Sequence, residues 1–189
     1  MKTKDLELFK KIPALYTERL ILRAISAKDA MDIYDYASDP LVSKWLLWNP
    51  HTSFDFSRRF AEQLERGYRD MKYYTWGVEF KGKMIGTCGF SAFDIKRNSA
   101  QVGYVLSSKY WGIGLATEAT RKVIKFGFDV LELSTIESRY IIENEASRRV
   151  AEKCGMRYFT TVKNAFTHRT GKRDMGISVI TKEEYYKNT

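Results

Sequence analysis

Short apolar runs and runs of alternating apolar and polar residues mark seven segments of the chain as β-strands. Two of them, residues 74–80 and 83–93, are separated only by Lys81-Gly82, which predicts a tight hairpin. The last two should form a long hairpin around a loop at residues 167–172. In chain order, the predicted strands are residues 19–25, 74–80, 83–93, 100–106, 135–142, 158–162 and 174–180.

Between these strands, apolar residues recur at steps of three and four, which predicts helices. Ser26 and Asp29 resemble a capping box for the first helix, which should run from residue 27 to about 38 and end at Asp39-Pro40. The second helix should start near Thr52 and turn one apolar face to the core. That face consists of Phe56, Phe60, Leu64 and Met71.

The third and fourth predicted helices lie on either side of the fifth strand in the sequence. Asn144 is a favourable N-cap for the fourth, and Gly155 occupies the position where glycine commonly ends a helix. A short terminal helix or tail follows the last strand from residue 182. The third helix spans residues 115–131, with a core stripe of Ala116, Ala119, Val123, Phe126 and Val130.

The element order is β-α-α-β-β-β-α-β-α-β-β, which predicts an α/β (α+β) fold: one mixed, mostly antiparallel seven-stranded sheet with helices on both faces. At 189 residues, one domain with a sizeable core is expected. We assign residues 17–182 to this domain and residues 183–189 to a C-terminal tail. Residues 1–16 form an N-terminal extension, with a short helix that stops near Pro13.

The chain is basic, with a net charge of +9 from 32 Lys and Arg against 23 Asp and Glu. The excess is concentrated in residues 139–173, which hold nine basic and three acidic residues. A basic surface of this kind can hold a polyphosphate ligand, attract an acidic partner, or only keep the protein in solution. No RNA-binding motif accompanies it, so specific nucleic-acid binding is not expected.

Neither a signal-peptide core nor an apolar run of about 20 residues occurs, so a cytoplasmic protein without membrane contact is expected. Cys88 and Cys154 match no metal-binding or redox spacing. We expect both to be buried free thiols, and we expect no metal site.

One stretch favours a ligand site. Residues 110–118 (Tyr-Trp-Gly-Ile-Gly-Leu-Ala-Thr-Glu) lie between a predicted strand and a predicted helix. Glycine permits positive φ and lets a ligand approach the backbone closely. The first turn of the helix has amide donors without an intrahelical partner, and the helix dipole favours an anion there. Together, the strand, the glycine turn and the helix N-terminus predict a phosphate-binding corner.

Four segments resemble motifs of the GNAT superfamily of N-acetyltransferases, and within it the RimJ/RimL-type ribosomal-protein alanine/serine N-acetyltransferases. The resemblance covers about residues 17–180, and it implies acetyl-CoA as the cofactor and coenzyme A as the product. The four segments are residues 17–23 (Thr-Glu-Arg-Leu-Ile-Leu-Arg), 101–106 (Gln-Val-Gly-Tyr-Val-Leu), 110–119 (Tyr-Trp-Gly-Ile-Gly-Leu-Ala-Thr-Glu-Ala) and 144–158.

The resemblance also implies which residues hold the cofactor. Backbone amides of residues 112–116 would bind the pyrophosphate of coenzyme A. Main-chain groups of residues 104–106 and the side chain of Asn144 would bind the pantetheine arm. Trp111 departs from the family's loop pattern, which has Gln or Arg at this place. The full set of implied contacts is Tyr104, Val105, Leu106, Trp111, Gly112, Ile113, Gly114, Leu115, Ala116, Thr117, Asn144, Ser147 and Lys153.

In this family the amine attacks the bound thioester directly. An α-amino group with a pKa near ~8 then needs only a weak base or a water relay. Ser147 matches a serine of the branch and is the candidate acid, because Ala151 stands where many members have a tyrosine; a helix-surface or cofactor-contact serine is the alternative. The candidate bases are Glu79, Glu143 and a water held by Gln101, which replaces a frequent Glu.

Three aromatic residues, Trp45, Trp48 and Tyr140, are candidates for the acceptor cleft, and packing in the core is the alternative for each. His51 and His168 lie in predicted loops and are expected to be solvated rather than catalytic.

The resemblance therefore implies an acyltransferase that moves acetyl from acetyl-CoA to a primary amine, with the N-terminal α-amino group of a protein, such as a ribosomal protein, as the leading acceptor. The alternatives are a small-molecule amine (polyamine, amino acid or antibiotic) and a non-catalytic acetyl-CoA-binding module. A dinucleotide-binding protein is disfavoured, because the loop lacks Gly-x-Gly-x-x-Gly. Either a monomer or a homodimer is compatible with these features.

Overall fold

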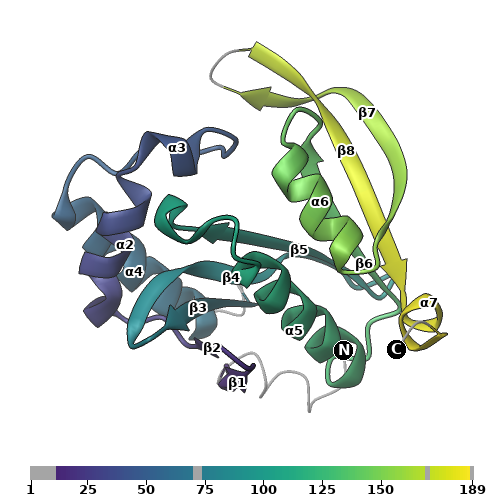
Figure 1. Cartoon of the computed structure of the whole chain (residues 1–189), viewed down its shortest axis with the longest axis horizontal. Helices are drawn as coiled ribbons and strands as arrows, with labels where there is room; N and C mark the ends of the chain where they lie inside the picture. The colour runs from purple at the N-terminus through teal and green to yellow at the C-terminus, as the bar shows by residue number, and fades with distance from the viewer. Residues whose placement is uncertain (1–11, 70–73, 169–170, 188–189) are drawn as a thin grey trace.

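The computed structural model describes residues 12–69, 74–168 and 171–187, and it shows one mixed sheet with helices on both faces (Figure 1). The described part has eight strands in the order β1-β2-β3-β4-β5-β6-β8-β7. Their bounds are β1 Leu15–Tyr16, β2 Leu20–Arg23, β3 Tyr74–Phe80, β4 Lys83–Asp94, β5 Ser99–Leu106, β6 Thr135–Ile141, β7 Arg157–His168 and β8 Gly171–Thr181.

The predicted α/β fold is confirmed, with one strand more than the seven expected. The additional strand is β1, which pairs with β2 so that Leu15 lies opposite Leu22. Two residues are too few for an alternating pattern, so the sequence carried no signal for it. The short helix expected in the N-terminal extension falls largely on residues 1–11, outside the described part.

The helices also follow the predicted order. Figure 1 shows α5 in front of the sheet and α4 behind it. In chain order, the helices are the 3-10 turn η1 Ala27–Asp29, α2 Ala30–Ala37, α3 Pro40–Ser43, α4 Phe54–Arg69, the 3-10 turn η2 Ser108–Tyr110, α5 Leu115–Asp129, α6 Glu145–Lys153 and α7 Lys182–Lys187. None of the described helices is long and apolar enough to cross a membrane.

β5 and β6 form a short parallel pair, in which residues 99–102 lie opposite residues 135–138. Beyond Val102, β5 continues to Leu106 while β6 turns away, and the two strands separate (Figure 1). On its other side β5 stays paired with β4 along its length. The sheet therefore opens at the C-terminal end of β5, with one edge of residues 103–106 left unpaired by strands of the described chain.

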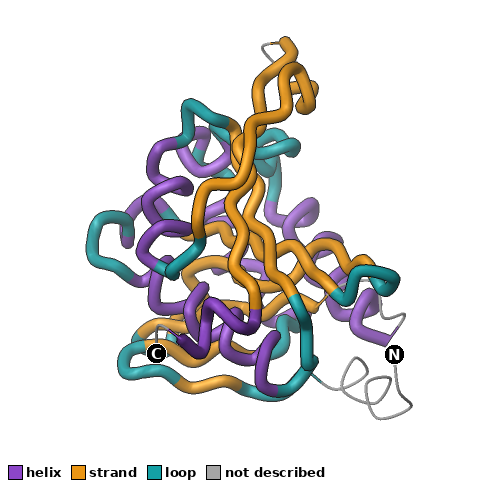
Figure 2. Tube along the Cα trace, turned by 90° about the vertical axis from the view of Figure 1, so that its right-hand side faces the viewer, coloured by secondary structure: helices purple, strands orange, loops and turns teal. Residues whose placement is uncertain are grey.

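Both predicted hairpins are present. Lys81 and Gly82 have φ of 51° and 77°, as the tight turn between β3 and β4 requires. The β7–β8 hairpin is longer than predicted, since β7 extends to His168 and β8 begins at Gly171. Figure 2 shows this hairpin projecting from the body of the molecule.

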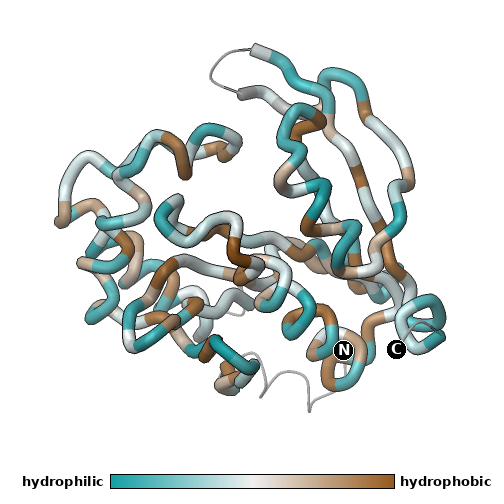
Figure 3. Tube along the Cα trace, viewed as in Figure 1, coloured by the Kyte–Doolittle hydropathy of each residue, from teal (hydrophilic) through white to brown (hydrophobic). Residues whose placement is uncertain are grey.

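The core lies on both faces of the sheet, under α2 and α4 on one face and under α5 on the other. Phe126 of α5 packs on Tyr74 and Trp76 of β3, with ring centroids 5.7 and 5.3 Å apart. Figure 3 shows hydrophobic and hydrophilic residues alternating along α5, as its predicted core stripe requires. Val130 was wrongly placed in that stripe: α5 ends at Asp129, and Val130 is 40% exposed. Cys88 and Cys154 are buried free thiols, as predicted.

The buried face of α4 agrees with the predicted one in part: Leu64 is buried and Phe60 is partly buried against the core, but Phe56 is not. Its buried residues are Ser57, Ala61, Leu64, Gly67 and Tyr68, whereas Phe56 is 46% exposed. Phe56 and Phe60 instead pack their rings on His51, with centroids 4.7 and 5.3 Å away. Met71, the last residue of the predicted face, lies outside the described part.

His51 was wrongly expected to be solvated. It is only 5% exposed, and its Nδ1 lies 2.8 Å from the hydroxyl oxygen of Ser57. Its backbone N–H donates to the carbonyl of Ala37 at 2.9 Å, so it fastens the segment after α3 onto α2. The side chain of His168 is not described.

The short helix α3 was not predicted. Asp39-Pro40 ends α2 and also begins α3, because the Asp39 carboxylate accepts from the N–H of Leu41 at 2.9 Å and proline is favoured in the first helical turn. Leu41 is 59% exposed on this helix, at the edge of the gap in the sheet.

Candidate active site

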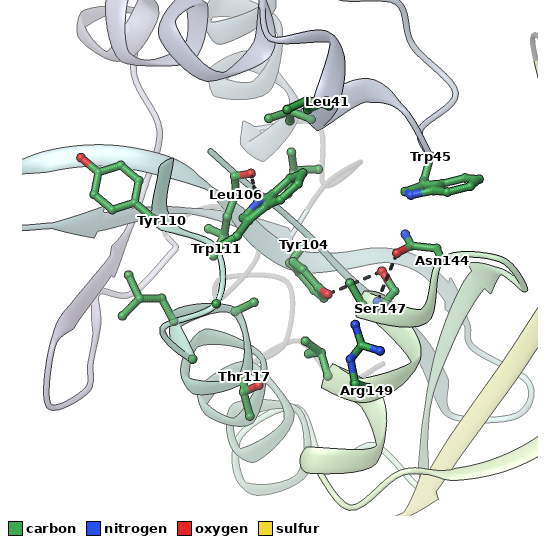
Figure 4. A pocket seen from close by; sticks show the side chains of 18 of the residues that line it. Leu41, Trp45, Tyr104, Leu106, Tyr110, Trp111, Thr117, Asn144, Ser147 and Arg149 are labelled. Atoms are coloured by element: carbon green, nitrogen blue, oxygen red, sulfur yellow. Dashed lines mark hydrogen bonds between the residues drawn. The ribbon is translucent and has the colours of Figure 1, made fainter. Parts of the chain in front are cut away.

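A cavity of about 310 Å³ lies where β5 and β6 separate (Figure 4). It is enclosed by α3, the end of β5, the glycine loop (residues 110–114), the start of α5 and one side of α6. Its lining residues are Leu41, Val42, Trp45, Leu46, Tyr104, Val105, Leu106, Tyr110, Trp111, Gly112, Gly114, Leu115, Ala116, Thr117, Asn144, Ala146, Ser147, Arg149, Val150 and Lys153.

The glycine loop forms the floor of this cavity. Gly112 and Gly114 have φ of 81° and 87°, a region that side chains with a Cβ rarely adopt. Gly114 is the N-cap of α5, so the free amides of the first helical turn point toward the loop. Trp111 donates from its indole N–H to the carbonyl of Leu106 at 2.8 Å, which ties the loop back to the end of β5. The loop therefore has the backbone geometry that the predicted anion site requires.

Two hydroxyls meet on the wall opposite the loop. The Tyr104 hydroxyl lies 3.5 Å from Oγ of Ser147, and the Ser147 N–H donates to Oδ1 of Asn144 at 3.3 Å, which caps α6. Burial raises the pKa of Tyr104 to about 12, so its phenol is protonated at neutral pH. The side chain of Tyr104 is a site group that the sequence did not reveal, since only its main chain was implicated. Its position on the face of β5 shared with Leu106 was the available signal.

A second cavity of about 660 Å³ lies on the other side of the loop. Gly114, Thr117 and Lys153 line both cavities, so the loop separates the two. Arg121 and Lys122 also line the second one, and they make it positive. Arg121 donates from Nε to the carbonyl of Lys153 at 3.1 Å, which holds its guanidinium beside the end of α6.

Of the residues expected to hold a cofactor, the cavity lining includes all but Ile113, which is 52% exposed. Ser147 and Trp45, a candidate acid and a candidate acceptor contact, also line it. The other candidates, Gln101, Glu79, Glu143, Trp48 and Tyr140, are not brought to the cavity.

Glu79 is held in an ion-pair cluster on a neighbouring part of the sheet. Its carboxylate lies 2.6 Å from Nε of Arg23, whose Nη2 lies 2.7 Å from Asp29. Burial opposes ionisation of Asp29, but hydrogen bonds from Arg23 and Ser26 outweigh it and lower the pKa of this carboxyl. Glu79 therefore serves as one of two anions around Arg23.

Three of the remaining candidates, Gln101, Tyr140 and Trp48, have packing or pairing roles. Gln101 is half-buried in the paired part of β5, opposite Glu137. Tyr140 is 5% exposed, with its hydroxyl 3.0 Å from that of Ser178, and Trp48 packs its ring on His51 at 5.4 Å. The role of each side chain depends on a neighbour in the tertiary structure, which the spacing of apolar residues in the sequence does not reveal.

The cavity combines anion-binding amides, an apolar wall and two hydroxyl donors. No carboxylate and no histidine is among its described lining residues, and its only ionic groups are Arg149 and Lys153. The described residues include no cluster of His, Cys, Asp and Glu that could hold a metal ion. Such a site suits a phosphate-bearing ligand with an uncharged arm.

Comparison with known proteins points the same way. Residues 19–157 match the family model described as "Acetyltransferase (GNAT) domain". The chain is 36% identical to p20 of Bacillus licheniformis, an N-acetyltransferase of uncharacterised role, over 70% of this chain and 76% of p20. It is 27% identical to YdaF of Bacillus subtilis, named as a candidate ribosomal N-acetyltransferase, over 73% of this chain and 78% of YdaF.

Among solved structures, an acetyltransferase of the GNAT family from Bacillus anthracis superimposes with a TM-score of 0.79 at 26% identity. The match covers 90% of this chain and 99% of that one, so the similarity extends over nearly the whole fold.

Proposed function

The chain belongs to the GNAT family of acetyltransferases, and from this premise we propose that it acetylates the N-terminal α-amino group of a protein. As a member of this family it is an N-acetyltransferase, and acetyl-CoA is its acetyl donor. The acceptor is the part of the function that has to be inferred from the cavity.

The residues present fit coenzyme A. The positive φ of Gly112 and Gly114 leaves the loop backbone open to a ligand, and the amides at the start of α5 can donate to a pyrophosphate. The unpaired edge of residues 103–106 can bond the amides of the pantetheine arm, with Asn144 across from it. Arg121 and Lys122 can attract the remaining phosphate of the nucleotide at the second cavity.

When bound, acetyl-CoA supplies the acetyl group as a thioester that a neutral amine attacks directly. The C–N bond forms as the C–S bond breaks, and the thiolate leaves with the electron pair. We assign the hydroxyls of Tyr104 and Ser147 to donate hydrogen bonds to this leaving group. The amine loses its proton to water, because no described residue of the lining is a carboxylate or histidine that could take it.

The lack of a carboxylate or histidine that could act as a base among the described lining residues is the observation that carries the choice of acceptor. An α-amino group, with a pKa near ~8, is partly neutral at pH 7, whereas a lysine amine, near ~10.4, needs a base to deprotonate it. Polyamines and aminoglycosides carry several positive charges, and the two ionic groups in the cavity are both cationic. The apolar side chains of Leu41, Val42 and Trp45 suit the first residues of a peptide.

The candidate assignment of YdaF, a relative over most of both chains, supports a ribosomal protein as the acceptor. The test is the rate of thiol release from acetyl-CoA with peptides that begin with Ala or Ser, compared with spermidine, free amino acids and an aminoglycoside. Faster turnover of the peptides is expected. Faster turnover of spermidine or the aminoglycoside would show that a small amine is the acceptor.

A non-catalytic acetyl-CoA-binding module is the second candidate, and it is favoured by Gln101 and Ala151, where many relatives have groups that carry protons. The same assay separates the two. Tight binding of acetyl-CoA with no thiol release for any amine would support the binding module and overturn the transferase mechanism.

A further inference from the structure

We propose that Arg19 is a positioning residue that fixes the orientation of one peptide group in the glycine loop, the one between Ile113 and Gly114. This inference rests on the proposed placement of the coenzyme A pyrophosphate on that loop. Arg19 lies immediately before β2, far from the loop in the sequence. The proposal makes it one of the residues that orient the loop backbone before the ligand binds.

The contacts of Arg19 converge on the loop from outside. Its Nη1 donates to the carbonyl of Ile113 at 2.9 Å, and its Nε lies 2.7 Å from Oε2 of Glu118, in the first turn of α5. The other oxygen of Glu118 accepts from the backbone N–H of Arg19 at 2.9 Å and from the hydroxyl of Thr17 at 2.6 Å. The guanidinium is thus held in one orientation by a carboxylate that two further donors hold in place.

A peptide group is planar, with its C=O and N–H pointing in opposite directions. Arg19 lines the second cavity and does not line the first, so the carbonyl of Ile113 is drawn toward the second. The N–H of Gly114 is then directed away from Arg19, toward the first cavity, which Gly114 also lines. Arg19 therefore presents a donor to the proposed pyrophosphate position.

This peptide has an accessible alternative. Gly114 has φ of 87° and ψ of 0°, the values of the third residue in a type II turn. In a type I turn the same central peptide is rotated by roughly half a turn, and glycine accepts the dihedral angles of both. The rotated form would point a carbonyl oxygen at the phosphates, which repels them. By holding the Ile113 carbonyl, Arg19 excludes that form before the ligand arrives.

A simpler role for Arg19 is attraction of the phosphates by its charge, and substitutions can separate the two. Arg19→Gln removes both the positive charge and the branched guanidinium group. Arg19→Lys keeps the charge but has a single nitrogen, which cannot bond Glu118 and the Ile113 carbonyl at the same time, as the guanidinium does. Arg157→Gln is the matched control: Arg157 lines neither cavity, and its Nε lies 2.7 Å from Glu184, the same kind of ion pair that Arg19 makes with Glu118.

The experiment measures affinity for coenzyme A by calorimetry and turnover with two donors, acetyl-CoA and S-acetylpantetheine, which lacks the pyrophosphate. Both Arg19 variants are expected to weaken coenzyme A binding by roughly tenfold and to raise KM for acetyl-CoA at unchanged kcat. Turnover of S-acetylpantetheine should not change, and Arg157→Gln should behave as wild type.

Wild-type affinity in Arg19→Lys would overturn the proposal, because charge would then suffice. Equal losses of turnover with both acetyl donors would also overturn it, since they indicate general damage to the fold. Thr17→Val removes a hydrogen bond to Glu118 and leaves Arg19 unchanged, so its thermal unfolding temperature is the reference for such damage. A wild-type chain that binds coenzyme A but acetylates no amine would overturn the proposed function. The coenzyme A affinities of the Arg19 variants would still test the role of Arg19. A wild-type chain without affinity for coenzyme A would overturn both.

Discussion

The hydroxyl of Tyr104 on β5 lies 3.5 Å from the hydroxyl of Ser147 on α6, across the gap where the two halves of the sheet separate. One residue comes from the strand that stays paired with β4, and the other comes from the helix that packs against the C-terminal strands. The pair therefore exists only when both halves of the fold are in place.

Removal of the Tyr104 hydroxyl should slow the chemical step. Tyr104→Phe is expected to lower kcat by roughly a hundredfold, because a hydrogen-bond donor to the leaving thiolate is lost. KM for acetyl-CoA should change little, since the ring and backbone remain. Steady-state thiol release measures both constants, and Tyr110→Phe, on the far side of the same cavity, is the matched control. Unchanged kcat in Tyr104→Phe would contradict the assignment.

Substitution of Glu79 should affect stability and leave catalysis intact. Glu79→Gln removes one of the two anions around Arg23 and is expected to lower the free energy of unfolding by about 1 kcal/mol. Urea unfolding measures this loss. Because Glu79 does not line the cavity, kcat should stay within about twofold of wild type. A large drop in kcat at normal stability would restore Glu79 as the base.

His51 should make the fold sensitive to mild acid. Burial lowers the pKa of His51 below its ordinary value. Between the folded pKa and the unfolded value near ~6.5, only the unfolded chain binds the proton. The free energy of unfolding is therefore not reduced by His51 above about pH 6.5, and it decreases as the pH falls from there through the folded pKa. Urea unfolding at several pH values should show this loss in the wild type and a flatter profile in His51→Gln.

A negative side chain in the loop should prevent cofactor binding. Gly114→Glu forces a side chain into a backbone conformation with φ of 87° and adds a charge that repels the pyrophosphate. Calorimetry should detect no coenzyme A binding by a folded variant. Gly82→Glu, also at a glycine of positive φ with open space around it, is the control for backbone strain and should bind normally. Normal affinity of Gly114→Glu would remove the loop from the site.

The parts of the fold that follow from local pattern could be predicted from the sequence. Lys81-Gly82 specifies its turn through backbone preference alone, and Asn144 specifies the start of α6 through one side-chain hydrogen bond. The face of α4 could not be predicted in the same way. Phe56 is apolar and correctly spaced, but its ring lies against His51 rather than in the central core, and only the tertiary structure brings that histidine there.

The same distinction holds for the candidate site. The loop and the cap belong to contiguous motifs, so the sequence located Gly112, Gly114 and Asn144 at the cavity. Glu79 depends on the register between β2 and β3, which places it beside Arg23 and away from the cavity. Arg19 and Glu118 are 99 residues apart, and no periodicity within either segment relates them.

The early end of the β5–β6 pairing has a consequence for how the ligand and the protein depend on each other. An extended arm with two amides, lying along residues 103–106, would take the place that a neighbouring strand occupies elsewhere in the sheet. The protein is in this sense a sheet with one short strand missing, and the substrate placed as proposed would supply that strand for the duration of each catalytic cycle. When the thioester is cleaved, the same segment has to leave again, so the strength of its pairing sets a lower limit on the time needed for product release.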